Sequence, residues 1–86
     1  MTLTLAVIGQ GYVGLPLAIA AAESGLKVFG IDVDVNKIQS INNGRSPVED
    51  ILDSRLSKAL KSGNYAAASD FDFVAEADVV VICVPT

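Results

Sequence analysis

Gly9-Gln10-Gly11-Tyr12-Val13-Gly14 is the stretch of sequence that decides the fold. An apolar run at 3–8 precedes it, a helix-like run at 15–23 follows it, and Asp32 ends the next apolar run. This order matches the dinucleotide-binding fingerprint, in which a strand, a glycine-rich turn and a helix are followed by an acidic residue. The sequence therefore predicts that this turn binds a dinucleotide.

Each glycine of this turn has a separate role in the fingerprint. Gly9 makes the tight turn after the strand, Gly11 lets the backbone approach a pyrophosphate, and Gly14 lets the helix pack closely on the sheet. The phosphates then meet the helix N-terminus, where unpaired N–H groups and the helix dipole favour an anion. Because Tyr12 and Val13 lie on this phosphate loop, we expect their backbone N–H groups to bind the cofactor.

Three charged residues after the second apolar run are candidates for the ribose site. Asp32 stands about twenty positions after the first glycine, where a carboxylate binds the adenosine ribose hydroxyls and repels a 2′-phosphate. We therefore expect NAD rather than NADP. Asp34 either caps the next helix, which is the favoured interpretation, or contacts the ribose. Lys37, one turn into that helix, either reaches the ribose, pairs with Asp32 or is an ordinary solvated lysine.

The composition excludes several classes of function. The net charge of −4 and the lack of a Lys/Arg cluster argue against nucleic acid or an anionic membrane as partner. The chain contains no histidine, which excludes a His-based metal or acid–base site, and we expect no metal centre. The first eight residues lack the basic segment of a signal peptide, and no apolar run is long enough to span a membrane, so we expect a cytoplasmic protein.

The size and apolar content predict part of a larger domain. The chain has 86 residues, and 51% of them are hydrophobic, which is unusually high for one small domain. We expect 1–86 to be the N-terminal part of an NAD-binding domain, with the substrate and catalytic domains outside this chain.

Strands and helices alternate along the predicted α/β chain. Strands are expected at 3–8, 27–32, 65–69 and 79–84, and helices at 15–23, 35–41, 47–62 and 71–76. Right-handed crossovers give the strand order 3-2-1-4, which is the first half of a doubly wound (Rossmann) parallel sheet with helices on both faces. Pro16 is expected either to delay the first helix or to make its first turn irregular, because it lacks an N–H group and disfavours a helical residue before it. Ser46 and Glu49 form a capping box around Pro47, which predicts a helix start there.

The fourth predicted strand ends at the edge where open α/β sheets bind their ligands. Thr86 closes this strand, so we expect Thr86 to face the cofactor. Cys83 lies within the strand, and a small buried hydrophobic residue is the favoured interpretation. The chain offers no placed general base and no exposed nucleophile, so we expect no catalytic residue here. The residues alone thus predict an NAD-binding half-domain of an oxidoreductase.

The sequence resembles the UDP-glucose/GDP-mannose dehydrogenase family. The motifs that carry the resemblance are Ile8-Gly-Gln-Gly-Tyr-Val-Gly-Leu-Pro-Leu-Ala18, Gly30-Ile-Asp-Val-Asp-Val-Asn-Lys-Ile38, Asn42-Asn-Gly44 and Val84-Pro-Thr86. Members oxidise the C6 alcohol of a nucleotide sugar to a carboxylate in two NAD-dependent hydride transfers, through a covalent adduct on a cysteine. The resemblance implies cofactor contacts at Gly9, Gly11, Gly14, Asp32, Lys37 and Thr86. It places the catalytic cysteine and lysine in later segments, so Cys83 is not that cysteine.

Two segments are more similar to the branch that acts on N-acetylated UDP-hexosamines than to the UDP-glucose branch. They are 11–18, with Leu15-Pro16, and 46–50. The resemblance implies a UDP-N-acetylglucosamine or UDP-N-acetylmannosamine 6-dehydrogenase, whose UDP-sugar is bound mainly by other domains, and we expect a homo-oligomer at full length. Its product would be a uronic acid precursor of a surface polysaccharide. The alternatives are a UDP-glucose 6-dehydrogenase, a hydroxyacyl-CoA or 6-phosphogluconate type dehydrogenase and, least favoured, a non-catalytic NAD-binding module.

Overall fold

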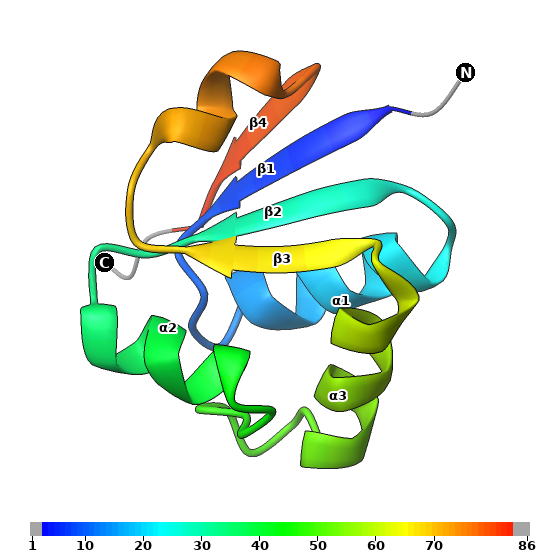
Figure 1. Cartoon of the computed structure of the whole chain (residues 1–86), viewed down its shortest axis with the longest axis vertical. Coiled ribbons are helices and arrows are strands. Elements are labelled where there is room, and N and C mark those ends of the chain that lie inside the picture. Colours follow the sequence, from blue (N-terminus) through cyan, green and yellow to red (C-terminus); the bar gives the residue numbers. More distant parts are fainter. Residues whose placement is uncertain (1–2, 84–86) are drawn as a thin grey trace.

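A four-stranded parallel sheet forms the centre of the protein, in a computed structural model that describes residues 3–83 (Figure 1). The strands are β1 (Thr4–Ile8), β2 (Lys27–Ile31), β3 (Tyr65–Ala68) and β4 (Val79–Ile82). Their order across the sheet is β3-β2-β1-β4, and every neighbouring pair is parallel. The predicted α/β class and strand order are confirmed.

Helices cover both faces of the sheet, as the sequence predicts. The helices α1 (Gly14–Glu23), α2 (Val35–Asn42) and α3 (Asp53–Ser62) lie on one side, and the 3₁₀ helix η1 (Asp72–Glu76) lies on the other (Figure 1). On the η1 side, the rings of Phe29 and Phe73 stack with their centroids 4.3 Å apart. None of these helices, all within 3–83, is long and apolar enough to cross a membrane.

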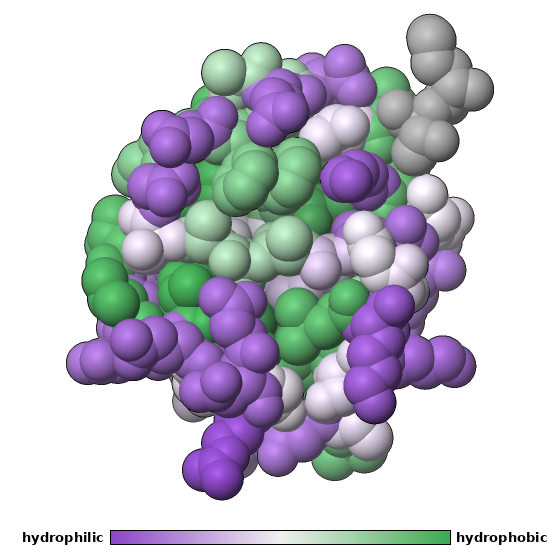
Figure 2. All heavy atoms as spheres, viewed as in Figure 1, coloured by the Kyte–Doolittle hydropathy of each residue, from purple (hydrophilic) through white to green (hydrophobic). Residues whose placement is uncertain are grey.

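The core lies between the sheet and the three α-helices. Its largest fully buried apolar side chains include Val7, Leu15, Ile19, Val28, Ile41 and Leu56. The edge strand β3 is Tyr65 followed by three alanines, and it appears as a band of pale green and white in Figure 2. The main buried cluster thus lies on the side of the sheet that carries α1.

The first helix begins earlier than Pro16 predicts. The helix α1 starts at Gly14, and the Leu15 N–H donates to the Gly11 carbonyl oxygen at 3.1 Å. Pro16 still falls within the first turn, where a helix tolerates a residue without an N–H group. Of the two expected alternatives, the late start is therefore wrong, and the Leu15 N–H is not available to a ligand.

The helix predicted for 47–62 is wrong at its start, because α3 begins only at Asp53. The Ser46 hydroxyl closes a local turn instead, accepting from the Val48 N–H at 3.1 Å and donating to the Val48 carbonyl oxygen at 2.8 Å. The Ser46 N–H donates to the carboxylate of Asp53 at 2.8 Å rather than to that of Glu49. The capping partner is thus the later acidic residue, and Val48 is buried in the core by the turn.

Candidate functional site

A cavity of about 500 Å³ lies where β1, β2 and β4 end. This volume is in the range of small-molecule and cofactor sites. Six of the predicted site residues line it: Gly9, Gly11, Tyr12, Val13, Asp32 and Lys37. It is also lined by residues that were not predicted for the site: Gln10, Pro47, Val48, Ile82 and Cys83. The structure thus brings the fingerprint turn and Asp32, the acidic residue directly after β2, to one hollow at the carboxyl edge of the sheet.

The three glycines of the turn have different surroundings. Gly9 has a φ of 96°, a left-handed conformation that favours glycine. A Cβ on Gly14 would overlap the carbonyl oxygen of Gly9, so the close approach of α1 to the turn requires a glycine. A Cβ on Gly11 would meet nothing nearer than the Lys37 Nζ at 4.0 Å. The space above Gly11 is therefore open, as a pyrophosphate would need.

The phosphate loop presents backbone donors rather than side chains to this space. Within residues 3–83, the N–H groups of Gly11, Tyr12 and Val13 donate to no protein acceptor. The side chains of Tyr12 and Val13 are turned largely to solvent, with 76% and 68% of each residue exposed. Because these N–H groups precede the first turn of α1, they suit an anionic group such as a phosphate.

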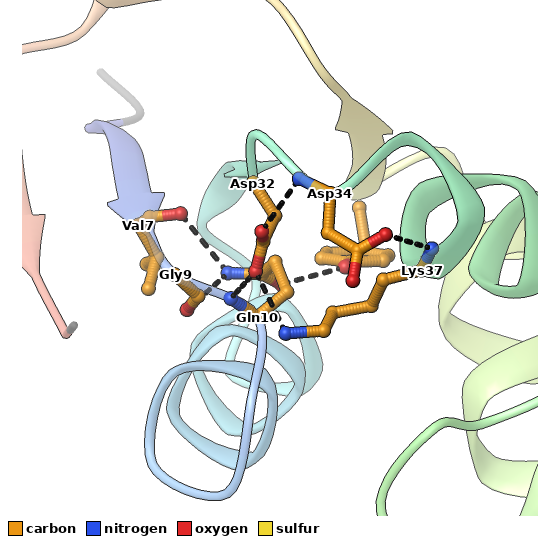
Figure 3. A network of polar contacts seen from close by, with 7 residues as sticks. Val7, Gly9, Gln10, Asp32, Asp34 and Lys37 are labelled. Carbon is orange, nitrogen blue, oxygen red and sulfur yellow. Dashed lines mark hydrogen bonds and ion pairs between the residues drawn. The ribbon is translucent and has the colours of Figure 1, made fainter. Parts of the chain in front are cut away.

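Asp32 is held by three donors around the cavity (Figure 3). Its Oδ2 accepts from the Gln10 N–H at 2.9 Å and from the Lys37 Nζ at 3.2 Å, and its Oδ1 accepts from the Asp34 N–H at 3.0 Å. Burial raises the pKa of Asp32, but these three hydrogen bonds and the charge of Lys37 lower the pKa below its usual value of 3.8. The carboxylate is therefore ionised at neutral pH.

The two other charged candidates have distinct positions. Asp34 caps α2, because its carboxylate accepts the Lys37 N–H at 3.1 Å, as the favoured interpretation predicts. Lys37 is not an ordinary solvated lysine: its Nζ pairs with Asp32, and only 28% of its side chain is exposed. A contact between Lys37 and a ribose stays a prediction.

Gln10 is the site residue that the sequence reasoning missed. Its side chain is fully buried, and its Nε2 donates to the Val7 and Gly9 carbonyl oxygens at 2.9 and 3.0 Å. Its Oε1 accepts from the Tyr65 hydroxyl at 2.7 Å. Burial, with the charge of Asp32 adding to it, raises the pKa of Tyr65, so the hydroxyl keeps the proton that it donates. The signal in the sequence was a glutamine between the first two glycines of the fingerprint turn.

Cys83 differs from its prediction, whereas the expectation for Thr86 stays a prediction. Cys83 follows β4 rather than lying within it, is half-buried, and lines the cavity, so the expected fully buried strand position is wrong. The Cys83 N–H donates to the Ile8 carbonyl oxygen at 2.7 Å, which holds the chain beside the turn after β1. Thr86, which was expected to face the cofactor, lies outside residues 3–83.

Residues 3–86 match the NAD-binding domain of the UDP-glucose/GDP-mannose dehydrogenase family. The chain belongs to this family. Its curated relatives include a UDP-N-acetyl-D-mannosamine dehydrogenase of Methanococcus aeolicus, which is 40% identical over 95% of the chain and 18% of the relative. The match confirms the predicted family and the predicted cofactor, NAD.

Solved structures of the family share the fold. A UDP-D-ManNAc dehydrogenase from Pyrococcus horikoshii matches with a TM-score of 0.89 and 36% identity, over 95% of this chain and 20% of that one. A UDP-glucose dehydrogenase from Pyrobaculum islandicum matches with a TM-score of 0.90 and 34% identity, over 98% of this chain and 20% of that one. The chain therefore spans about a fifth of the length of these family members.

Proposed function

We propose that this chain is the NAD-binding portion of a nucleotide-sugar 6-dehydrogenase that oxidises the C6 alcohol of a UDP-N-acetyl-hexosamine to the uronate. The observation that carries the proposal is the cavity in which a glycine-rich loop, whose N–H groups have no acceptor among residues 3–83, meets an ionised carboxylate held by protein donors. These groups fit the pyrophosphate and the ribose diol of NAD. When bound, NAD supplies the hydride acceptor for each of the two oxidation steps.

The chain's own residues bind and orient rather than react. In the proposed complex, the N–H groups of Gly11, Tyr12 and Val13 hold the pyrophosphate, and Asp32 accepts hydrogen bonds from the ribose hydroxyls. The charge of Lys37 is largely neutralised by Asp32 at 3.2 Å, so it offers little attraction to an additional phosphate. The site therefore favours NAD over NADP. Cys83 lines the same cavity, and we assign it no catalytic role.

The substrate class is proposed from the relatives and from the motifs. Two of the proteins compared above, at 40% and 36% identity, are described as dehydrogenases of UDP-N-acetylmannosamine. The segments 11–18 and 46–50 resemble the same branch, and Pro47 and Val48 of the second segment line the cavity. We place the catalytic cysteine, the catalytic lysine and most substrate contacts in further domains of the protein. We also propose that the full-length protein is a cytoplasmic homo-oligomer and that its product is a precursor of a surface polysaccharide.

The test is an NADH assay on the gene product that carries this chain. It is incubated with NAD and, separately, with UDP-N-acetylglucosamine, UDP-N-acetylmannosamine, UDP-glucose and GDP-mannose. The proposal expects NADH with one of the N-acetylated UDP-sugars and a uronate as the product. NADH with UDP-glucose would favour the alternative UDP-glucose 6-dehydrogenase, which the structural match to the Pyrobaculum islandicum enzyme supports. Turnover of a hydroxyacyl-CoA or of 6-phosphogluconate, but of no nucleotide sugar, would contradict the proposal.

A further inference from the structure

Gln10 stands out because it is a polar residue with no solvent exposure. It is the one fully buried polar or charged residue found in the part of the chain from 3 to 83. Burying an amide is costly unless each of its polar atoms finds a partner. Here the Nε2 bonds two carbonyl oxygens and the Oε1 accepts from Tyr65, so the amide is fully satisfied.

The contact between Gln10 and Tyr65 also depends on the absence of a side chain at Gly30. A Cβ on Gly30 of β2 would overlap the Gln10 Oε1 and would lie 2.7 Å from the Tyr65 Oη. A larger residue at Gly30 would therefore separate the amide from the hydroxyl. The contact between Gln10 and Tyr65 joins the turn after β1 to the first residue of β3, across the intervening strand β2.

The same residue connects this buried contact to the cavity. The Gln10 Nε2 fixes the carbonyl oxygen of Gly9, inside the fingerprint turn, at 3.0 Å. The backbone N–H of Gln10 fixes the Oδ2 of Asp32 at 2.9 Å, and Figure 3 shows both contacts around the one residue. A buried network whose members are all satisfied holds a single arrangement, because any other arrangement leaves a polar atom unpaired.

We propose that Gln10 and Tyr65 are positioning residues for the cofactor, which set the phosphate loop and the Asp32 carboxylate in register without a side-chain contact to NAD. This inference rests on the proposed function, since it concerns the same site. Loosening the pair lets the Gly9 turn and the carboxylate shift relative to each other. NAD, which must engage both at once, loses affinity, and the discrimination against NADP weakens because it depends on the direction of the carboxylate.

The test compares Tyr65→Phe with a control in the gene product that carries this chain. Tyr65→Phe removes only the hydroxyl and keeps the ring that fills the core. Calorimetric titration should show that the dissociation constant for NAD rises about three- to tenfold, the equivalent of one buried hydrogen bond. The dissociation constant for NADP should rise less, so the ratio of the NADP dissociation constant to the NAD dissociation constant should fall. The control, Leu56→Ala, empties a fully buried core position on α3 that does not line the cavity.

The control separates positioning from general loss of stability. Leu56→Ala should lower the thermal midpoint while leaving both dissociation constants unchanged below the unfolding transition. Equal losses for NAD and NADP in Tyr65→Phe, wild-type affinities in that variant, or the same losses in Leu56→Ala would each overturn the inference. A wild-type protein that binds no NAD would instead contradict the proposed function, which keeps the two failures apart.

Discussion

Replacing Asp32 by alanine tests the ribose assignment directly, because protein donors alone hold this carboxylate in place. It accepts from the Gln10 N–H at 2.9 Å, the Asp34 N–H at 3.0 Å and the Lys37 Nζ at 3.2 Å, and only 11% of the side chain is exposed. Little reorganisation is thus needed when ribose hydroxyls arrive. In the variant, these three donors lose their acceptor and Lys37 loses its counter-charge.

The size of the effect follows from the hydrogen bonds at stake. A hydrogen bond to a charged group contributes about 1.5–3 kcal/mol. The ribose diol offers two donors, but the carboxylate already serves three protein donors, so we expect a loss of about 2–3 kcal/mol, or roughly 30- to 150-fold in NAD affinity. For NADP the removed charge also removes a repulsion, and Lys37 becomes free to attract the 2′-phosphate. The affinity for NADP should therefore hold or rise, and the preference for NAD should disappear.

Calorimetric titration of wild type and Asp32→Ala with both cofactors measures this shift in preference. Asp34→Ala is a matched control, because Asp34 is the neighbouring acid and caps α2 without lining the cavity. Loss of that cap should cost about 1 kcal/mol of stability and leave the ratio of the two affinities unchanged. Equal wild-type affinity for NAD and NADP, or an unchanged ratio in Asp32→Ala, would refute the ribose assignment.

Three further predictions concern the same chain. Since the folded pKa of Asp32 lies below 3.8, the stability that its ionised form contributes is fully present above that pH and is lost as the pH falls through the lowered pKa. The free energies of unfolding of wild type and Asp32→Ala, measured in urea, should therefore approach each other in acid. A difference between them that stays constant with pH would contradict this prediction. Gly11→Val should abolish NAD binding in a titration while the far-UV circular dichroism stays the same, and retained binding would mean that no phosphate approaches Gly11. The 86 residues expressed alone should self-associate through β4, where Val80 and Ile82 are 41% and 68% exposed at an edge of the sheet. Sedimentation over a concentration series should show less association for Val80→Lys, and a wild-type chain that stays monomeric would contradict the edge argument.

The fold could be predicted from the sequence because its signals are local. The fingerprint turn fixes a strand, a turn and a helix within a few residues, and the handedness of crossovers then orders the strands. Even β3, with its weak alanine-rich pattern, follows from the alternation of elements. The start of α3 could not be predicted, because Ser46 has two acidic partners within reach. Burial of Val48 in the core decides between them, and burial is a tertiary property.

In the candidate site, too, some features follow from local sequence and others from tertiary contacts. The acid at position 32 and the loop N–H groups follow from spacing alone. The contact between Gln10 and Tyr65 joins residues 55 positions apart, so no local pattern indicates it. The pairing of Lys37 with Asp32 was one of several alternatives that spacing leaves open, and only the relative placement of β2 and α2 selects it.

The glycines around this site have two different roles, one in the packing of the protein and one in ligand binding. Gly14 and Gly30 are required by atoms of the protein itself, since a Cβ at either position would overlap the Gly9 carbonyl oxygen or the Gln10 amide. Gly11 is different, because a Cβ there meets no atom of the protein closer than 4.0 Å. A substitution at Gly14 or Gly30 should therefore disturb folding and binding together, whereas one at Gly11 should disturb binding alone. A requirement for glycine at Gly11 would therefore come from a ligand close above the loop and not from the protein itself.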